Sequence, residues 1–225
     1  MRARILYLGS MLLVTASVIG PVSTAAGPSP PGAFSARVDN PWFPLTPGTR
    51  YLYVGVKDGQ PSRDVLTVTR SVKTIDGVPC TVVEDRLYLR GRLAERTTDW
   101  YTQDRKGNIW YFGEDTAELD RKGRVASSAG TWRAGVHGAV PGVFMPAHPH
   151  LGQTGRQEFL KGQAEDHFKV IGVFATNAVL TEEWTPLEPG TVDHKLYVRD
   201  IGTVLEQTEQ GGDERNELVS VTQVR

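Results

Sequence analysis

Residues 99–115 read DWYTQDRKGNIWYFGED. The stretch consists of two runs of strand-forming residues, 99–104 and 108–115, on either side of a polar turn that contains Gly107. This pattern predicts a β-hairpin. Because alternate side chains of a strand share one face, one face of this hairpin is expected to mix aromatic rings with carboxylate and amide groups.

The same period-two alternation continues over most of the chain and gives about eleven or twelve strand-like runs. Turn residues separate the runs, among them Asp58-Gly59 and Asp76-Gly77, and Asp-Gly readily supplies the positive φ of a tight hairpin. No apolar stripe of helical length is present. We therefore predict an all-β protein, an antiparallel meander closed or curled into a barrel or half-barrel, with a two-sheet sandwich as the alternative.

Residues 134–154 interrupt the alternation. The stretch holds four Gly and three Pro and few strand formers. We expect a long irregular connection here, and long ordered loops of compact domains often border binding sites.

Composition excludes several classes of protein. The 225 residues carry 25 Lys+Arg and 26 Asp+Glu, a formal net charge of -1. This balance argues against nucleic-acid binding, which needs a basic surface to neutralise phosphates. Cys80 is the single cysteine, so an intramolecular disulfide and a Cys-x-x-Cys metal site are excluded.

The N-terminus has the pattern of a secretory signal peptide. Arg2 and Arg4 precede an uncharged apolar run, residues 5–20, and small residues around Ala25 suit a signal peptidase. The alternative is an uncleaved N-terminal anchor, although the run is shorter than the ~20 residues that a membrane-spanning helix needs. We predict a secreted, extracytoplasmic protein with no transmembrane segment in its mature chain.

Three segments are therefore expected. Residues 1–25 are the signal peptide, and residues 26–39, rich in Pro and Gly at their start, form a flexible linker. Residues 40–225 form a single barrel-like domain, since one domain is the default at this length.

Aromatic rings interleaved with a few polar groups are the usual lining of a small-ligand pocket. The hairpin and the polar run that begins at residue 156 offer both kinds of group. We predict as ligand-binding residues Trp100, Tyr101, Gln103, Trp110, Tyr111, Phe112, Arg156 and Gln157. The alternative is that the rings are ordinary core residues, because aromatic side chains dominate β cores.

Several stretches resemble an uncharacterised family of bacterial secreted proteins. They read NPWFPL (40–45), IDGVPC (75–80), DWY through EDT (99–116), MPAHP (145–149) and RQE (156–158). The resemblance covers nearly the whole mature chain and implies secretion without pointing to an activity. The Tyr197–Val204 hairpin is also similar to a closing hairpin of periplasmic β-sheet proteins that bind lipids or other hydrophobic molecules, which implies a fold and not a substrate.

Four side chains are candidates for acid or base catalysis: Asp99, Glu114, His148 and Glu158. A buried carboxyl has a raised pKa and can act as a general acid. Adjacent acids on a strand point to opposite faces, so a doublet such as Glu114-Asp115 can place only one carboxylate inside.

Metal binding is not favoured. The candidates are His148, His150, Glu158 and His167, a set that loosely resembles the His-x-His and Glu pattern of the cupin family. Pro149 lies between the first two histidines, and Glu158 follows eight residues after His150, which departs from that pattern. A metal site needs three or four converging ligands, so we expect neither a metal nor another cofactor.

Three functions are left open. The first is a secreted barrel that binds a small hydrophobic or amphipathic molecule, which requires a hollow interior. The second is a secreted enzyme, a hydrolase or cyclase, which requires two of the acid or base groups at one cavity. The third is an envelope-associated structural or interaction protein, which a filled interior would favour.

Overall fold

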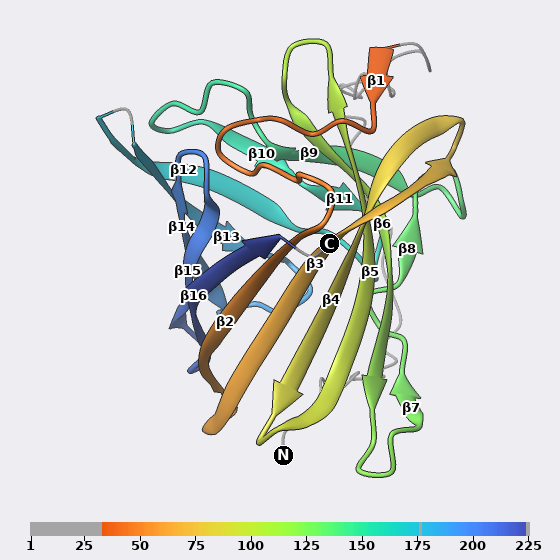
Figure 1. The fold of residues 1–225 in the computed structure, drawn as a ribbon, viewed down its shortest axis with the longest axis vertical. Coiled ribbons are helices and arrows are strands. Elements are labelled where there is room, and N and C mark those ends of the chain that lie inside the picture. Colours follow the sequence, from red (N-terminus) through yellow and green to blue (C-terminus); the bar gives the residue numbers. More distant parts are fainter. Residues whose placement is uncertain (1–32, 176, 224–225) are drawn as a thin grey trace, which may run out of the picture.

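The computed structural model describes residues 33–175 and 177–223, so the predicted signal peptide and the start of the linker lie outside the described residues. The described chain is almost entirely antiparallel β-structure, wound into a nearly closed barrel (Figure 1). Its sixteen strands are β1 (Phe34–Ser35), β2 (Thr49–Lys57), β3 (Gln60–Ile75), β4 (Val78–Leu89), β5 (Arg92–Asp104), β6 (Ile109–Leu119), β7 (Val125–Ser127), β8 (Trp132–Arg133), β9 (Val140–Met145), β10 (Thr154–Arg156), β11 (Glu158–Phe159), β12 (His167–Phe174), β13 (Ala178–Trp184), β14 (Val192–Val198), β15 (Gly202–Gln210) and β16 (Arg215–Gln223). The predicted fold class is confirmed, with more strands than expected.

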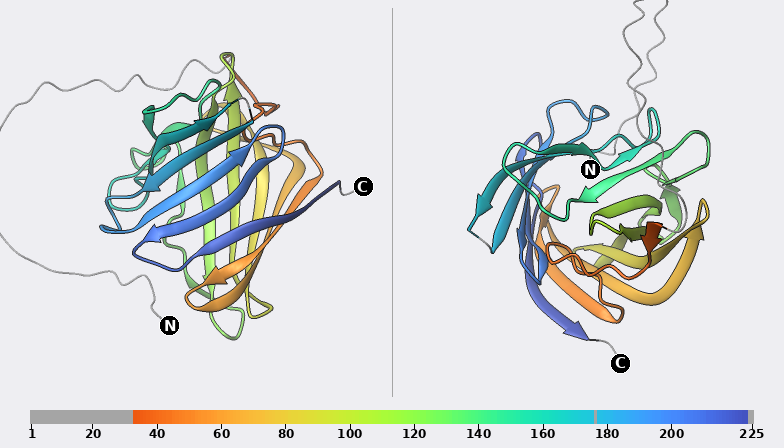
Figure 2. Two further views of the ribbon diagram at one scale, coloured as in Figure 1. Left: turned by 90° about the vertical axis from the view of Figure 1, so that its left-hand side faces the viewer. Right: turned by 90° about the horizontal axis from the view of Figure 1, so that it is seen from above.

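Two meanders make the wall of the barrel. Strands β2 to β6 pair in chain order, and strands β12 to β16 do the same. The last strand, β16, pairs with β2 along the register Gln223↔Thr49 to Arg215↔Val56, which joins the two meanders. Seen from above, the strands surround a common axis (Figure 2). No helix long and apolar enough to cross a membrane occurs in the described part of the chain.

A single short segment closes the other side of the barrel. β10 pairs with β12, and β11 pairs with β9, while only Gln157 separates β10 from β11. Gly142 on β9 makes this approach possible, because a Cβ built there would lie 2.1 Å from the carbonyl oxygen of Arg156. The absence of a side chain at this position is what lets β9 and the closing segment pack backbone to backbone.

The hairpin turns follow the sequence expectation. Both residues of the Asp58-Gly59 and Asp76-Gly77 pairs have positive φ, at 52° and 65° and at 47° and 76°. Positive φ at both central residues defines the type I′ turn, whose twist matches that of the flanking strands. These pairs connect β2 to β3 and β3 to β4.

Two parts of the chain differ from the prediction. The 134–154 stretch is not wholly irregular, since it contains β9, which reads VPGVFM and pairs with both β6 and β11. Its Pro and Gly hide the strand signal, and the pairing comes from tertiary contacts that override local propensity. Residues 124–132, whose alternation predicts a single strand, are divided between the short strands β7 and β8, both paired with β6. Extra short strands of this kind account for the higher strand count.

The described part of the predicted linker, residues 33–39, packs on the barrel. Phe34 pairs with Asp104 at the end of β5, and its ring makes edge contacts with Trp110 and Phe112. The backbone N–H groups of Asp39 and Asn40 both donate to the Gln103 side-chain oxygen at 2.9 Å. The folded unit therefore begins before residue 40.

The segment after the linker covers one end of the barrel and inserts Phe43 into it. The Phe43 ring contacts Tyr101 of β5, Phe144 of β9 and Tyr197 of β14, with centroid distances of 5.6, 4.8 and 6.5 Å. These strands come from different sides of the wall. Phe43 therefore plugs this end of the barrel with an aromatic layer.

Candidate functional site

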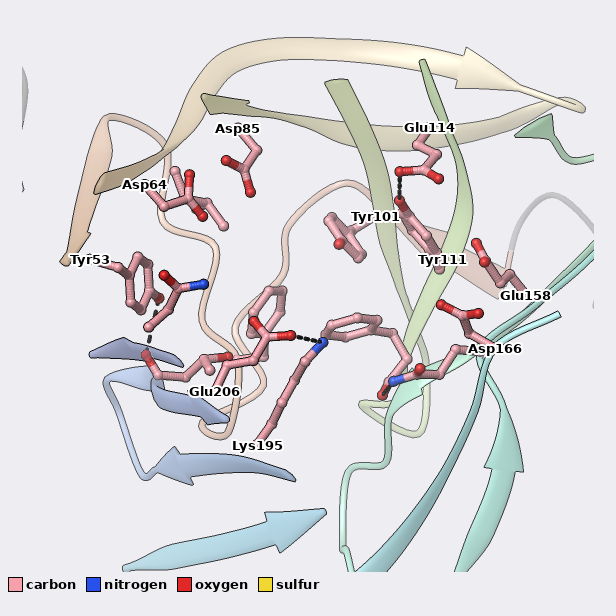
Figure 3. Close-up of a pocket in the computed structure, with 16 residues that line it drawn as sticks. Tyr53, Asp64, Asp85, Tyr101, Tyr111, Glu114, Glu158, Asp166, Lys195 and Glu206 are labelled. Atoms are coloured by element: carbon pink, nitrogen blue, oxygen red, sulfur yellow. Dashed lines mark hydrogen bonds and ion pairs between the residues drawn. The ribbon is translucent and has the colours of Figure 1, made fainter. Parts of the chain in front are cut away.

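A cavity of about 230 Å3 lies inside the barrel next to this aromatic layer (Figure 3). Side chains from ten strands line it, together with Phe43, Gln157 and Asp166 from the connections between strands. They are Phe43, Tyr53, Asp64, Leu66, Asp85, Tyr101, Tyr111, Glu114, Phe144, Gln157, Glu158, Asp166, Lys195, Thr203, Glu206 and Asn216. The barrel is therefore hollow, and its interior carries many ionisable groups.

One wall of the cavity is aromatic. The rings of Tyr101 and Tyr111 are stacked with their centroids 4.7 Å apart and an interplanar angle of 18°. Phe144 meets Tyr101 edge-on at 5.1 Å. Rings held in this way present a rigid apolar surface to whatever occupies the cavity.

A β-bulge explains why Tyr111 and Glu114 both face the cavity although they are three residues apart. The register of β5 and β6 shifts between the pair Asp99↔Glu114 and the pair Tyr101↔Tyr111. Gly113 has a φ of 133°, and a Cβ there would lie 2.4 Å from the carbonyl oxygen of Trp132. The extra residue changes the phase of the alternation, so an acid that strict period two puts on the other face turns inward.

Asp99, Tyr111 and Glu114 form a hydrogen-bonded group. The Tyr111 hydroxyl donates to Asp99 Oδ1 at 2.6 Å and lies 3.3 Å from Glu114 Oε2. Burial raises the pKa of Asp99 to about 7, although the bond from Tyr111 opposes the rise. Burial and the charge of Asp99 raise the pKa of Glu114 to about 8, against the hydrogen bond from the Thr116 hydroxyl. Both carboxyl groups therefore titrate near neutral pH, where proton exchange with a guest is possible.

Glu158 is the most deeply buried acid that lines the cavity and lies at the closing segment of the barrel. Its relative exposure is 6 %, and its Oε2 atom has no hydrogen-bond partner among the described residues. Burial raises its pKa to about 9, with further contributions from Asp166 and Glu114. The nearby Trp132 indole opposes this rise of the Glu158 pKa, although the indole N–H does not reach hydrogen-bond geometry with Glu158 or with any other described residue. Glu158 is therefore a protonated, undersatisfied carboxyl at neutral pH.

Asp64 and Asp85 lie on the opposite wall, on the neighbouring strands β3 and β4 (Figure 3). Burial, followed by the charge of Asp64, raises the pKa of Asp85 well above its usual range. The Asp64 Oδ1 atom is buried and has no hydrogen-bond partner in the described chain. This wall therefore adds two more acids, neither of which forms an ion pair with a Lys or Arg among the described residues.

Lys195 is the basic side chain among the described residues that line the cavity. Its ammonium lies 3.0 Å from Glu183 and 3.3 Å from Glu206. Burial opposes its charge, but these two carboxylates outweigh burial and raise the pKa of Lys195. The Tyr197 hydroxyl also donates to Glu183 at 3.2 Å. Lys195 is thus already paired with Glu183 and Glu206 and forms no ion pair with Asp64, Asp85, Glu114 or Glu158.

Three of the predicted ligand-binding residues line the cavity, namely Tyr101, Tyr111 and Gln157. Tyr101 and Tyr111 are inward-facing residues of β5 and β6, as the alternation requires. Gln157 lies between β10 and β11, where its backbone N–H donates to Asp166 O at 2.7 Å. The hairpin thus contributes to the cavity on the face that carries these tyrosines.

The other five predicted ligand-binding residues do not line this cavity. Trp110 and Phe112 pack against Phe34, and the Trp110 indole donates to Asp104 Oδ2 at 3.0 Å. Trp100 lies with the Lys73 ammonium 4.2 Å above its ring, beside a separate surface depression. The remaining two are Gln103, which holds the 39–40 backbone, and Arg156, whose guanidinium lies 4.1 Å from the centre of the Phe159 ring. Alternation separates Trp100, Trp110 and Phe112 from the interior. Gln103 has the parity of Tyr101 but lies near the end of β5, where it bonds to the N-terminal segment.

The catalytic candidates are only partly brought together. Glu114 and Glu158 line the cavity, and Asp99 lies behind Tyr111, bonded to its hydroxyl, whereas His148 is exposed on the loop after β9. Asp115 is exposed, as the doublet argument requires.

The metal candidates do not converge. His150 is exposed, like His148. The His167 ring stacks on Trp184 with the ring centroids 5.6 Å apart, and its Nδ1 atom lies 2.8 Å from the backbone carbonyl oxygen of Glu165, just before β12. Within residues 33–175 and 177–223 no group of three or more His, Cys, Asp or Glu side chains is placed to hold a metal ion.

Sequence reasoning missed several acids of the cavity and its lysine. Asp85 lies on the same face of β4 as Val83 and Leu87, both of which are buried, so the pattern of β4 did indicate an inward carboxylate. Asp64 likewise lies on the inward face of β3, the face that carries the buried residues Ser62 and Val68. Lys195 and Glu206 had no such signal, because their strands mix polar and apolar residues on both faces.

Comparison with known proteins adds little. No family model and no curated protein matches the chain. Among solved structures, the crystal structure of a "putative lipoprotein" from Parabacteroides distasonis is similar, with 10% sequence identity and a TM-score of 0.39, over 80% of this chain and 98% of that chain. The function is therefore inferred from the geometry of the cavity.

Proposed function

We propose that the protein binds a small amphipathic molecule inside its barrel. The observation that supports this is a cavity whose wall divides into stacked rings on one side and a set of carboxyl groups on the other. An apolar surface with a few polar groups is the usual composition of a small-ligand site. A structural barrel with no guest has no evident use for an empty interior lined by acids, because burying carboxyl groups costs stability.

The volume limits the guest. At the packing density of protein interiors, 230 Å3 holds a molecule of roughly ten non-hydrogen atoms. Its apolar part would lie on Tyr101, Tyr111 and Phe144, and its polar part would lie toward Glu114 and Glu158.

A thermal-shift experiment tests this function. The full chain is mixed with a panel of amphipathic molecules of this size (alcohols, amines and carboxylic acids with alkyl or phenyl groups). A guest that binds only the native state raises the melting temperature. Leu66→Trp fills the cavity from β3 and should abolish the rise, whereas Val65→Trp adds the same bulk at the neighbouring outward position and should leave it. No rise with any probe, or an equal rise in Leu66→Trp, would overturn the proposal.

A second candidate function is favoured by one specific observation: Glu114 and Glu158 line the same cavity, and the Tyr111 hydroxyl links Glu114 to Asp99. Carboxyl groups that titrate near neutral pH can serve as general acid and base, in keeping with a secreted hydrolase or cyclase. Chromogenic ester and glycoside substrates test it directly. Turnover that disappears in Glu114→Gln but persists in Asp115→Asn would support an enzyme, and no turnover would leave binding as the function.

Export and family membership belong to the same proposal. We base export on the N-terminal pattern and the family on the quoted motifs, one of which supplies Phe43, the plug of the barrel. Cell fractionation with N-terminal sequencing of the mature protein tests export, and a first residue near Ala26 is the expected result.

A further inference from the structure

We propose that the guest of the cavity is a small organic cation, an amine or a guanidinium, whose charged end lies beside Glu158 and Glu114 and whose apolar part lies on the stacked tyrosines. This inference rests on the proposed binding function and specifies the chemical class of the guest. It is carried by the charge balance of the interior and by the unsatisfied carboxyl at its closing segment.

The charge balance is the first observation. Six carboxyl groups and one lysine line the cavity. The lysine, Lys195, is already paired with Glu206 and with the neighbouring Glu183. Buried charges in proteins are normally paired, so Asp64, Asp85, Glu114 and Glu158, all buried or partly buried, must either stay protonated or meet a cation from outside. With a neutral guest these acids stay protonated, whereas a cationic guest lets those that face it ionise, and an anionic guest is repelled by any that are ionised.

Glu158 is the second, independent observation. It is more than nine-tenths buried, lines the cavity, and has an Oε2 atom with no hydrogen-bond partner among the described residues. Once it has lost its proton, this carboxyl can accept hydrogen bonds at both oxygens, and an ammonium or guanidinium supplies several charge-assisted donors at once. Figure 3 shows Glu158 next to Asp166 and Tyr111, on the side of the cavity where Glu114 also lies.

The aromatic wall fits the same guest. Tyr101 and Tyr111 are stacked 4.7 Å apart, and a cation near the face of such a ring is attracted by its quadrupole. The Tyr111 hydroxyl is committed to Asp99, so the ring offers its aromatic surface more than its hydroxyl. Rings and carboxyl groups together form the kind of surface that recognises an organic cation and that repels an anion.

Three probes of nearly equal size test the inference. They are 2-phenylethylamine, 2-phenylethanol and phenylacetate, which carry a cationic, a neutral and an anionic end. Binding to the full chain is measured by isothermal titration calorimetry at pH 7. We expect the amine to bind at least tenfold more tightly than the alcohol, since hydrogen bonds between charged groups are stronger than those between neutral groups. We expect no binding of phenylacetate.

The outcomes separate the two proposals. If the alcohol or phenylacetate binds as tightly as the amine, the cation inference is wrong and the binding function stands. If none of the three probes and no member of the amphipathic panel binds, both are wrong. Hexylamine and hexanol repeat the comparison without an aromatic ring, and a preference for the amine in both pairs is expected.

Two further readouts bear on the named residues. Glu158→Gln should weaken amine binding about tenfold and change alcohol binding by much less, because glutamine keeps hydrogen-bonding groups but not the charge. Asp115→Asn, at an exposed position on β6, should change neither. Binding heats in buffers of different ionisation enthalpy should reveal proton release when the amine binds, because the cation favours the ionised form of the acids that face it. Equal amine affinity in Glu158→Gln, together with no proton release, would overturn the assignment of the cation to this place.

Discussion

Replacing Glu158 by glutamine is expected to stabilise the protein, and increasingly so as the pH rises. The folded state raises the pKa of Glu158 to about 9 from its usual value of 4.5. A carboxyl with a raised pKa has to be neutralised on folding once the unfolded chain is ionised, so stability is greatest below about pH 4 and falls as the pH rises toward 9. Glutamine has nearly the same shape as the protonated carboxyl and escapes this loss.

The size of the effect follows from linkage. Each pH unit above the unfolded pKa costs about 1.4 kcal/mol, so the gain from Glu158→Gln should be about 1 kcal/mol at pH 5 and about 3 kcal/mol at pH 7. Urea denaturation of the full chain at both pH values, compared with the unsubstituted protein and with Asp115→Asn, measures it. We expect the Asp115→Asn difference to be independent of pH, because that side chain is exposed. A Glu158→Gln difference that does not grow between pH 5 and pH 7, or a loss of stability at pH 7, would refute the description of Glu158 as a buried, protonated acid.

Three other outcomes are expected. Gly142→Ala should destabilise the chain by about 2–3 kcal/mol, because its Cβ would meet a backbone oxygen of the closing segment at 2.1 Å; Gly212→Ala, which meets only a threonine methyl at 3.1 Å, is the control in thermal unfolding. Lys195→Met should cost about 2–3 kcal/mol in urea denaturation at pH 7, since it leaves two carboxylates without their cation, and an unchanged midpoint would count against the ion-pair description. Tyr101→Leu should abolish the thermal shift given by a bound probe, whereas Trp110→Leu, on the opposite face, should lower the melting temperature without abolishing the shift.

The fold could be predicted from short-range features of the sequence. Period-two alternation and Asp-Gly turns are local, and both survive in the structure. What the sequence hid depends on contacts between distant segments. The sequence does not indicate β9, because Pro141 and Gly142 are poor strand formers. Its position is determined by pairing with β6 and β11. Phe34 has no strand signal around it, yet its contacts with Trp110 and Phe112 hold the N-terminal segment on the barrel.

The candidate site shows the same division. Alternation alone puts Tyr101 and Asp99 on one face, and both point inward. For Glu114 alternation fails, because the bulge at Gly113 shifts the phase by one residue. A glycine inside a strand pattern is a known sign of a bulge, so this inward acid was predictable in principle. The ion pairs of Lys195 were not, since they join β14 to β13 and β15 through a register that only the folded sheet defines.

The most direct test is to locate a guest inside the barrel. The full chain, with 13C in its tyrosine rings and 15N in its tryptophan indoles, is titrated with 2-phenylethylamine and followed by NMR. We predict nuclear Overhauser contacts between the probe and the rings of Tyr101 and Tyr111, with the Trp110 indole signal unchanged. Contacts confined to Trp110 and other outward rings, or no contact with Tyr101 and Tyr111 at saturating probe, would contradict binding in the interior.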